Sequence, residues 1–166
     1  MRPAFHAFLS RIKCVEVGVH SGKHAREMLE HLPTAQFFLI DSYDVNNSTF
    51  QDSGKPPKTE AERLTFIQAV IDSLTPYGNR AHLIIKDSEE AAKYFDDESL
   101  DFVYIDAQHE YAAVMKDIRT WWPKVRKGGI LSGDDCVEPS VKQAVLDCFR
   151  DKVMYGNDHP DWIVSK

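Results

Sequence analysis

Four residues that follow two apolar segments have the types and spacing needed for metal chemistry. Asp106 comes directly after the segment 101–105, and His109 comes three residues later. Asp134 and Asp135 follow "GGILSG", which ends the next apolar segment. Neighbouring strands lie about 4.8 Å apart, so if these two segments are adjacent strands, the three carboxylates converge on one rim of a sheet.

Three unpaired carboxylates at such a distance repel one another and raise one another's pKa, and a bound dication relieves that conflict. An all-oxygen ligand set suits magnesium, manganese or calcium better than zinc. We therefore expect Asp106, Asp134 and Asp135 to hold a divalent metal, with Mg²⁺ as the first candidate. The alternative is that these aspartates cap turns or are simply solvated.

His109 also has two interpretations. A histidine at the start of a helix is usually a surface residue. Three residues after a metal ligand, however, it is placed to take a proton from a metal-bound hydroxyl. We expect His109 to be the general base and Asp106 to share the catalytic site.

A glycine-containing turn, "VEVGVHSGK", marks a second candidate site at residues 15–23. Gly18 allows a tight turn and a close approach of backbone to ligand, and Gly22 allows close approach at a helix start. The pattern E-x-G-x-x-x-G lacks the G-x-G-x-x-G that seats a dinucleotide pyrophosphate. This favours a ligand without phosphate, such as S-adenosylmethionine, contacted by Glu16, Gly18, His20 and Gly22.

Three further polar residues end predicted strands. Asp41 lies where an α/β sheet presents an acid to ribose hydroxyls, and Asp87 and Ser88 lie where an adenine edge could be met. A glycine turn followed by such residues can also be only a turn. Together, the residues follow the rule that ligands bind outside the carboxyl ends of the strands.

These residues need a sheet to position them, and the chain alternates short apolar runs with helical periodicity. That alternation predicts βαβ units and a mostly parallel sheet. The expected strands are Ile12–Val17, Gln36–Ile40, His82–Lys86, Asp101–Ile105 and Gly129–Leu131. The last fifteen residues predict two short strands around a Gly-Asn-Asp turn, closing one edge. We expect about seven strands and five helices in a single α/β domain, residues 1–166.

The helices have recognisable starts and buried faces. Expected helices are Lys23–His31, Tyr111–Trp122 with Val114, Ile118 and Trp121 buried, and one from Pro139 that buries Val141, Val145 and Cys148 or Phe149. Thr59 and Glu62 form a predicted capping box. Leu64, Ile67, Ile71 and Leu74 then have the spacing of a buried face. Ser88 is the expected cap of a short helix.

The polar stretch 42–58 is long for a connection inside a compact domain and is either a lid or binding loop or a surface insertion. Composition limits the partners. The 166 residues have a formal net charge of −6 and no basic run, which argues against nucleic acid. Three cysteines without C-x-x-C spacing argue against disulfides or a zinc knuckle. No segment is long enough to span a bilayer, and the first residues lack a signal-peptide core, so we expect a cytoplasmic protein.

The sequence resembles a known family at four places: "VEVGVHSGKHAREML", "DSEEAAKYF", "DFVYIDAQHEYAAVMKDIRTWWPKVRKGGILSGDDC" and "VKQAVLDCF". It is similar to class I methyltransferases of the methyltransferase-24 type and, in its Asp-x-x-His and Gly-Asp-Asp motifs, to metal-dependent macrocin- and mycinamicin-type sugar O-methyltransferases. The resemblance runs from about Lys13 to Phe149. It implies a Rossmann-like three-layer α-β-α sandwich of seven strands, in the order 3-2-1-4-5-7-6, with the seventh antiparallel.

The resemblance also implies roles for single residues. Glu16, Gly18 and Asp41 match the cofactor-binding positions, with Asp87 and Ser88 at the adenine. Asp106, Asp134 and Asp135 match the metal ligands, and His109 matches the catalytic base.

The expected activity is S-adenosylmethionine-dependent, metal-assisted O-methylation of a small hydroxylated molecule, a sugar or a catechol-like compound. The acceptor pocket would come from the 42–58 loop, the segment after Asp135, or a second subunit of a homo-oligomer. The alternatives are a nicotinamide-dependent oxidoreductase, for which the phosphate fingerprint is missing, and a non-catalytic methyltransferase-like binding subunit.

Overall fold

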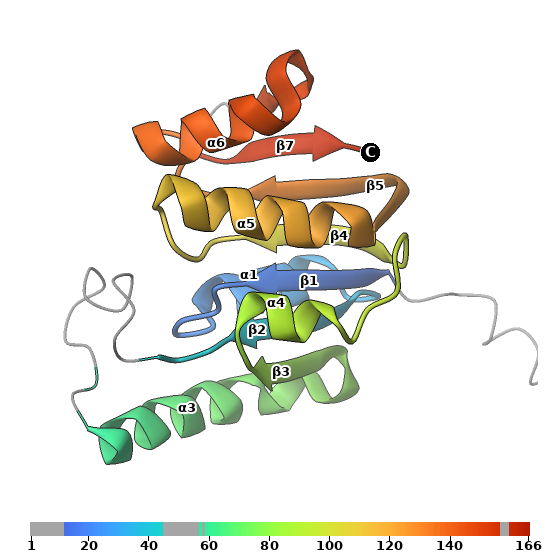
Figure 1. The fold of residues 1–166 in the computed structure, drawn as a ribbon. Coiled ribbons are helices and arrows are strands. Elements are labelled where there is room, and N and C mark those ends of the chain that lie inside the picture. Colours follow the sequence, from blue (N-terminus) through green and yellow to red (C-terminus); the bar gives the residue numbers. More distant parts are fainter. Residues whose placement is uncertain (1–11, 45–56, 58, 157–159) are drawn as a thin grey trace, which may run out of the picture.

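The fold is built on one seven-stranded sheet in the order β3-β2-β1-β4-β5-β7-β6 (Figure 1). The structure, a computed structural model, describes residues 12–44, 57, 59–156 and 160–166. β1 to β5 run parallel, β7 is antiparallel to β5, and β6 is antiparallel to β7. The strands are β1 Lys13–Val17, β2 Gln36–Asp41, β3 Ala81–Ile85, β4 Leu100–Ile105, β5 Val125–Gly133, β6 Met154–Tyr155 and β7 Trp162–Ser165. The predicted order and the antiparallel seventh strand are confirmed.

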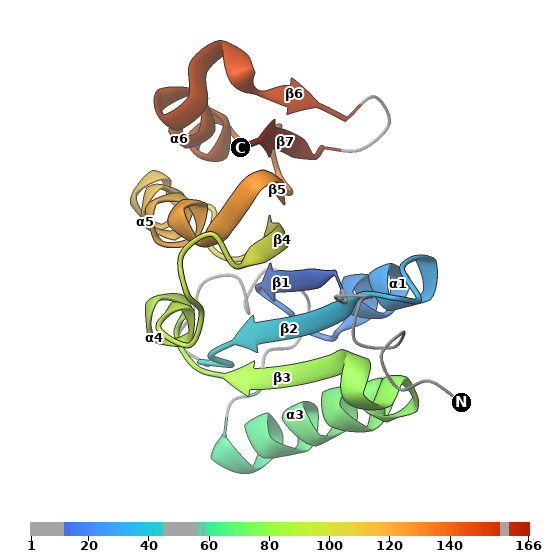
Figure 2. The same ribbon diagram turned by 90° about the vertical axis from the view of Figure 1, so that its right-hand side faces the viewer.

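Helices cover both faces of the sheet and make it the middle of three layers. Figure 2 shows α4, α5 and α6 on one face and α1 and α3 on the other. Their bounds are α1 Lys23–His31, α3 Glu60–Leu74, α4 Ser88–Ala92, α5 Tyr111–Trp121 and α6 Pro139–Phe149. Short 3₁₀ turns lie at Thr75–Arg80, Trp122–Lys124 and Arg150–Lys152. The Rossmann-like sandwich is therefore confirmed.

Alternate residues of the strands enter two separate apolar cores. Val15 and Val17 pack in the core that contains Trp121 of α5, whereas Cys14 packs in the core that contains Leu29 of α1. Successive side chains of a strand point to opposite faces, so β1 is buried on both. This explains the apolar residues Cys14, Val15 and Val17 on its two faces, and it makes the burial of the charged Glu16 notable.

The buried face of α3 differs from the predicted one. Leu64 and Ile71 are 54% and 40% exposed, and the buried residues are Ile67, Val70 and Leu74. At 100° per residue, Val70 and Leu74 lie on one side of Ile67, and Leu64 and Ile71 lie on the other. The predicted stripe was thus rotated by part of a turn toward solvent.

The helix starts agree in part with prediction. Thr59 Oγ1 accepts from the backbone N–H of Glu62 at 3.2 Å, which confirms that half of the capping box. Ser88, in contrast, is the first residue of α4, and Asp87 occupies the cap position without a side-chain cap bond. The Ser88 hydroxyl is engaged in a contact with α5 that the local sequence does not reveal.

Other predictions have mixed outcomes. β5 is longer than the predicted Gly129–Leu131, because its polar first residues carry no apolar signal. All three cysteines are free. No helix in the described part of the chain is long and apolar enough to cross a membrane. Most of the 42–58 loop and the turn at 157–159 lie outside the described residues.

Candidate active site

A cleft of about 770 Å³ lies at the carboxyl ends of β1, β2 and β4. Its volume is within the range of small-molecule sites. The predicted site residues that line it are Glu16, Gly18, His20, Asp41, Asp87, Ser88, Asp106, His109 and Asp135. Gly22 and Asp134 are not among its lining residues. The cleft therefore lies outside the carboxyl ends of the strands, where α/β sheets bind their ligands.

The turn after β1 is packed directly against the end of β4. Gly18 has φ of +93°, and a Cβ there would lie 1.7 Å from the carbonyl oxygen of Asp106. The backbone N–H of Asp106 donates to the carbonyl of Val17 at 2.8 Å. Gly22 has φ of +69° and begins α1 against Val70. Gly18 therefore forms the floor of the cleft, whereas Gly22 sets the start of the helix.

Asp41 holds this turn by accepting three backbone hydrogen bonds. Its Oδ2 accepts from Val19 and His20 at 3.0 and 2.8 Å, and its Oδ1 accepts from Tyr43 at 2.7 Å. Tyr43 is fully buried and donates its hydroxyl to the carbonyl of His20 at 3.1 Å. A carboxylate offers about four lone-pair sites, so one remains for a ligand hydroxyl. Asp41 thus shapes the cleft as well as lining it.

Glu16 is buried at the base of the cleft with only one of its oxygens paired. The residue is 1% exposed, and its Oε1 lies 3.2 Å from Nδ1 of His24. Its Oε2 is buried and has no hydrogen-bond partner among the described residues. Burial raises the pKa of Glu16, and the contact with His24 partly opposes that rise. An unpaired buried carboxylate oxygen is suited to a cationic ligand group.

Asp106, His109 and Asp135 form a compact group of possible metal ligands. One ligand atom from each residue lies within 4.8 Å of the other two. Nε2 of His109 is 2.8 Å from Oδ2 of Asp135. Asp135 takes a left-handed conformation with φ of +61°, which lets the chain change direction directly after β5. The structure therefore brings together three of the four residues singled out by the sequence.

Asp134 is the predicted ligand that falls outside this group. Its Oδ1 accepts the backbone N–H of Asp135 at 2.7 Å, so the carboxylate caps the turn. Two consecutive residues seldom direct their side chains to one point, and the turn at Asp135 favours the second of this pair. The compact group thus contains two aspartates and His109, whereas the metal set of Asp106, Asp134 and Asp135 stays a prediction; Asp134 is close enough to act on Asp106 through its charge.

The electrostatics of Asp106 reflect this crowding. Burial raises its pKa to about 7, with further contributions from the charges of Asp134, Asp135 and Glu16. A carboxyl group whose charged form is disfavoured by neighbouring carboxylates is a site where a bound cation gains most. The donor set of two carboxylates and an imidazole fits a divalent cation.

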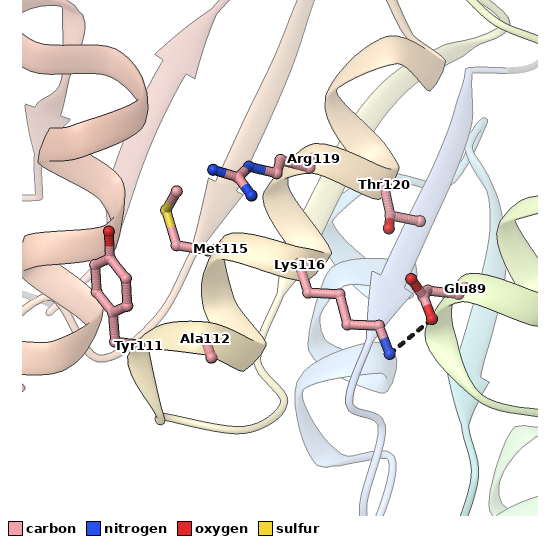
Figure 3. Close-up of a pocket in the computed structure, with 7 residues that line it drawn as sticks. All are labelled: Glu89, Tyr111, Ala112, Met115, Lys116, Arg119 and Thr120. Atoms are coloured by element: carbon pink, nitrogen blue, oxygen red, sulfur yellow. Dashed lines mark ion pairs between the residues drawn. The ribbon is translucent and has the colours of Figure 1, made fainter.

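A second pocket, of about 500 Å³, lies on the outer side of α5 (Figure 3). Figure 3 shows Tyr111, Met115 and Arg119 along this helix, with the ion pair between Lys116 and Glu89, 2.6 Å long, at the edge facing α4. Of the residues that the sequence singled out for catalysis or binding, none lines this pocket.

Sequence reasoning missed three residues of the cleft region. His24 contacts Glu16, Tyr104 of β4 stacks against His24, and Asp117 of α5 lines the cleft beside Ser88. His24 could have been found from its position, since the first turn of a helix after a glycine turn lies over the end of the preceding strand. Asp117 offered only one signal, a charged residue on the apolar side of its helix.

Comparison with known proteins decides the family. The chain matches the methyltransferase-24 family, a methyltransferase domain, over residues 15–136. The chain belongs to this family. Among curated proteins, no significant sequence match was found.

Solved structures of other methyltransferases share this domain's fold at low identity. A TDP-rhamnose 3′-O-methyltransferase of calicheamicin biosynthesis has a TM-score of 0.62 and 14% identity, over 97% of this chain and 74% of the other. An S-adenosylmethionine-dependent O-methyltransferase from Thermotoga maritima has a TM-score of 0.59 and 15% identity, over 93% of this chain and 52% of the other. An rRNA methylase from Streptococcus thermophilus has a TM-score of 0.57 and 14% identity, over 98% of this chain and 94% of the other. Identities this low establish the fold alone.

The cleft of this methyltransferase domain fits S-adenosylmethionine. The methyl donor carries a sulfonium and an α-ammonium group, and the unpaired Oε2 of Glu16 is an acceptor for such a cation. Gly18 lines the cleft, and no pyrophosphate fingerprint is present in the sequence.

Proposed function

We propose that this methyltransferase domain catalyses metal-assisted O-methylation of a small hydroxylated acceptor. One observation carries the proposal. Possible ligand atoms of Asp106, His109 and Asp135 lie within 4.8 Å of one another in the cleft that also contains the Gly18 turn. A methyl donor held at that turn and an acceptor oxygen held at the carboxylates would lie in one cleft.

The need for metal assistance follows from the reaction. A sulfonium methyl group is already a good electrophile, whereas an alcohol is a poor nucleophile near neutral pH. A divalent cation held by Asp106 and Asp135 would lower the pKa of the acceptor hydroxyl. Magnesium is the first candidate, because carboxylate oxygens suit hard cations. Asp134 would add negative charge near the cation without contacting it.

His109 is the proposed general base. Its Nε2 is 2.8 Å from Asp135 Oδ2, so the carboxylate orients the imidazole toward the cleft that both residues line. In the proposed reaction the acceptor O–H bond breaks and its proton passes to His109. The oxygen forms a bond to the methyl carbon, and the bond from that carbon to sulfur breaks, which leaves S-adenosylhomocysteine.

The acceptor is proposed to be a sugar or a catechol-like compound, since a vicinal diol has two oxygens that can engage the same cation. The concentration of acids in the cleft disfavours anionic acceptors. A formal net charge of −6 disfavours RNA, although one structural neighbour is an rRNA methylase. The TDP-rhamnose methyltransferase among the neighbours supports testing sugars first.

The test is a methyl-transfer assay with a panel of sugars and catechols, in magnesium and in excess chelator. Asp106→Asn and Asp135→Asn should abolish turnover while S-adenosylhomocysteine affinity stays largely intact. His109→Asn should lower kcat by about 10²- to 10⁴-fold. His31→Asn, on the exposed end of α1, is the matched control and should leave the rate unchanged. Full activity in excess chelator would remove the metal from the proposal.

Two other readouts separate the alternatives. Calorimetry should detect binding of S-adenosylhomocysteine and no binding of NAD, because the turn after β1 lacks the pyrophosphate fingerprint. Tight cofactor binding without transfer to any acceptor would favour a non-catalytic subunit. The group of Asp106, His109 and Asp135 argues against that outcome, because binding a cofactor alone does not require it.

A further inference from the structure

A chain of hydrogen bonds joins α4 to α5 beside the cleft. The Trp121 indole Nε1 donates to Ser88 Oγ at 2.8 Å, and Ser88 Oγ donates to Asp117 Oδ1 at 2.5 Å. An indole N–H can only donate, and an ionised carboxylate can only accept. The direction of both bonds is therefore fixed, and the Ser88 hydrogen is committed to Asp117.

Asp117 is buried in this chain of hydrogen bonds, yet half of its carboxylate remains unused. The residue is 7% exposed and lines the cleft, with Ala113 one turn earlier on α5. Its Oδ2 accepts no hydrogen bond from the residues that the structure describes. Buried charges are normally paired or hydrogen-bonded through all their oxygens, so Oδ2 is suited to a donor supplied by a ligand.

The position of Asp117 in the cleft indicates which ligand group it meets. Asp106 follows β4 and Asp41 ends β2, so the strand order places them on either side of β1, whereas Asp87 and Ser88 follow β3, on the far side of β2. Ser88 is hydrogen-bonded to Asp117, which lines the same cleft. A nucleoside that places its sulfur near Asp106 and its ribose near Asp41 extends its base toward α4 and α5. Adenine offers a donor there, its exocyclic amino group.

We propose that Asp117 Oδ2 accepts a hydrogen bond from the exocyclic amino group of the cofactor's adenine, and that Ser88 and Trp121 position the carboxylate for it. The inference rests on the proposed function, because it takes S-adenosylmethionine as the ligand. It assigns recognition of the adenine base to a residue on α5. Ser88, expected from the sequence to meet the adenine itself, becomes a positioning residue that acts through Asp117.

The ionisation of Asp117 is consistent with this role. Burial raises its pKa to about 6, while the Ser88 hydrogen bond and Lys116 oppose the rise. The carboxyl group is therefore mostly ionised at pH 7.5 and acts as an acceptor. An acceptor at this position favours adenine over hypoxanthine, whose corresponding group is a carbonyl oxygen.

Calorimetry with two ligands tests the assignment. The unmodified chain should bind S-adenosylhomocysteine at least about tenfold more tightly than S-inosylhomocysteine at pH 7.5. In Asp117→Asn, the amide oxygen can still accept from Ser88, which turns the amide NH₂ toward the cleft. We expect affinity for the adenine ligand to fall about tenfold and the preference to disappear or reverse.

Two further variants keep the result interpretable. Asp72→Asn, an exposed substitution on α3 away from the cleft, is the matched control and should preserve the preference for adenine. Ser88→Ala removes the positioning bond and keeps the carboxylate, so it should weaken the preference without reversing it. Thermal melts of each variant confirm that it is folded.

The outcomes separate this inference from the proposed function. An unchanged preference in Asp117→Asn, or an equal loss of preference in Asp72→Asn, would overturn the assignment to Asp117. If the unmodified chain does not bind S-adenosylhomocysteine at all, the proposed function fails and this inference fails with it.

Discussion

The imidazole of His24 lies over the phenol ring of Tyr104, with ring centroids 4.3 Å apart, and its Nδ1 is 3.2 Å from Glu16 Oε1. Helix α1 thereby supplies the hydrogen-bond partner of a carboxylate that β1 buries. Two residues given no joint role by the sequence turn out to stabilise the base of the cleft together.

His24→Ala should destabilise the protein, because Glu16 then keeps a buried carboxylate without its partner. Removing one member of a buried pair typically costs about 3 kcal/mol or more, and part of that cost is recovered when the other charge is also removed. Urea unfolding of His24→Ala, Glu16→Gln and the double variant should give a double variant more stable than the sum of the singles implies. Additive losses would contradict a direct coupling of the two residues.

Gly18→Ala should damage both folding and cofactor binding, since its Cβ would lie 1.7 Å from the Asp106 carbonyl oxygen. We expect a loss of at least about 3 kcal/mol in unfolding free energy. Gly78→Ala is the matched control, because Gly78 also has a positive φ, of +56°, but no atom lies within 4 Å of its Cβ position. That control should cost about 1 to 2 kcal/mol, from backbone strain alone. Equal losses in the two variants would show that the contact with Asp106 is unimportant.

Metal affinity should distinguish Asp135 from Asp134. Paramagnetic Mn²⁺ binding, followed by electron paramagnetic resonance, should weaken by about tenfold or more in Asp135→Asn. Asp134→Asn should weaken it less, because the Asp134 carboxylate caps the turn and is outside the ligand group. A larger effect from Asp134→Asn would restore the ligand set expected from the sequence.

The stability of the metal-free protein should fall as pH rises through the titration of Asp106. Its pKa is raised from 3.8 to about 7 in the folded state, so the folded protein holds this proton more tightly than the unfolded chain. Stability from this group is complete below about pH 4 and is lost on going to pH 7, by on the order of 4 kcal/mol.

Asp106→Asn removes this titration. In chelator, its melting temperature should exceed that of the unmodified protein at pH 8, and the difference should shrink toward pH 5. Asp151→Asn, an exposed substitution outside the cluster, should show no such trend. A difference that does not change with pH would argue against the strained carboxyl group.

The sheet and its order could be predicted because parallel strands buried on both faces are almost continuously apolar, as in residues 36–40. The buried face of α3 could not be predicted, since Leu64 and Ile71 lie three and four residues from Ile67, and Val70 and Leu74 lie three and seven residues from it, all of which are helical spacings. Only packing against the sheet decides between two adjacent stripes. Sequence spacing defines the possible faces of a helix, and tertiary contacts select one of them.

The candidate site shows the same division. Asp106 and His109 were predictable from their place after a strand, because the carboxyl ends of parallel strands share one edge of the sheet. The position of Asp134 outside the group of Asp106, His109 and Asp135 depends on the positive φ of Asp135, which no local pattern encodes. The role of Asp117 could not be predicted, because it depends on the hydrogen bond by which Ser88 joins α4 to α5.

The backbone contact between Gly18 and Asp106 joins the proposed cofactor turn after β1 to the proposed cation site after β4. A shift of the Asp106 main chain on cation binding would move the surface against which the methyl donor rests, and the reverse holds as well. Thermodynamic reciprocity then requires that each ligand change the affinity of the other by the same factor. In such an enzyme, cation and cofactor are bound cooperatively, and the order in which they arrive does not change the total free energy of assembling the reactive complex.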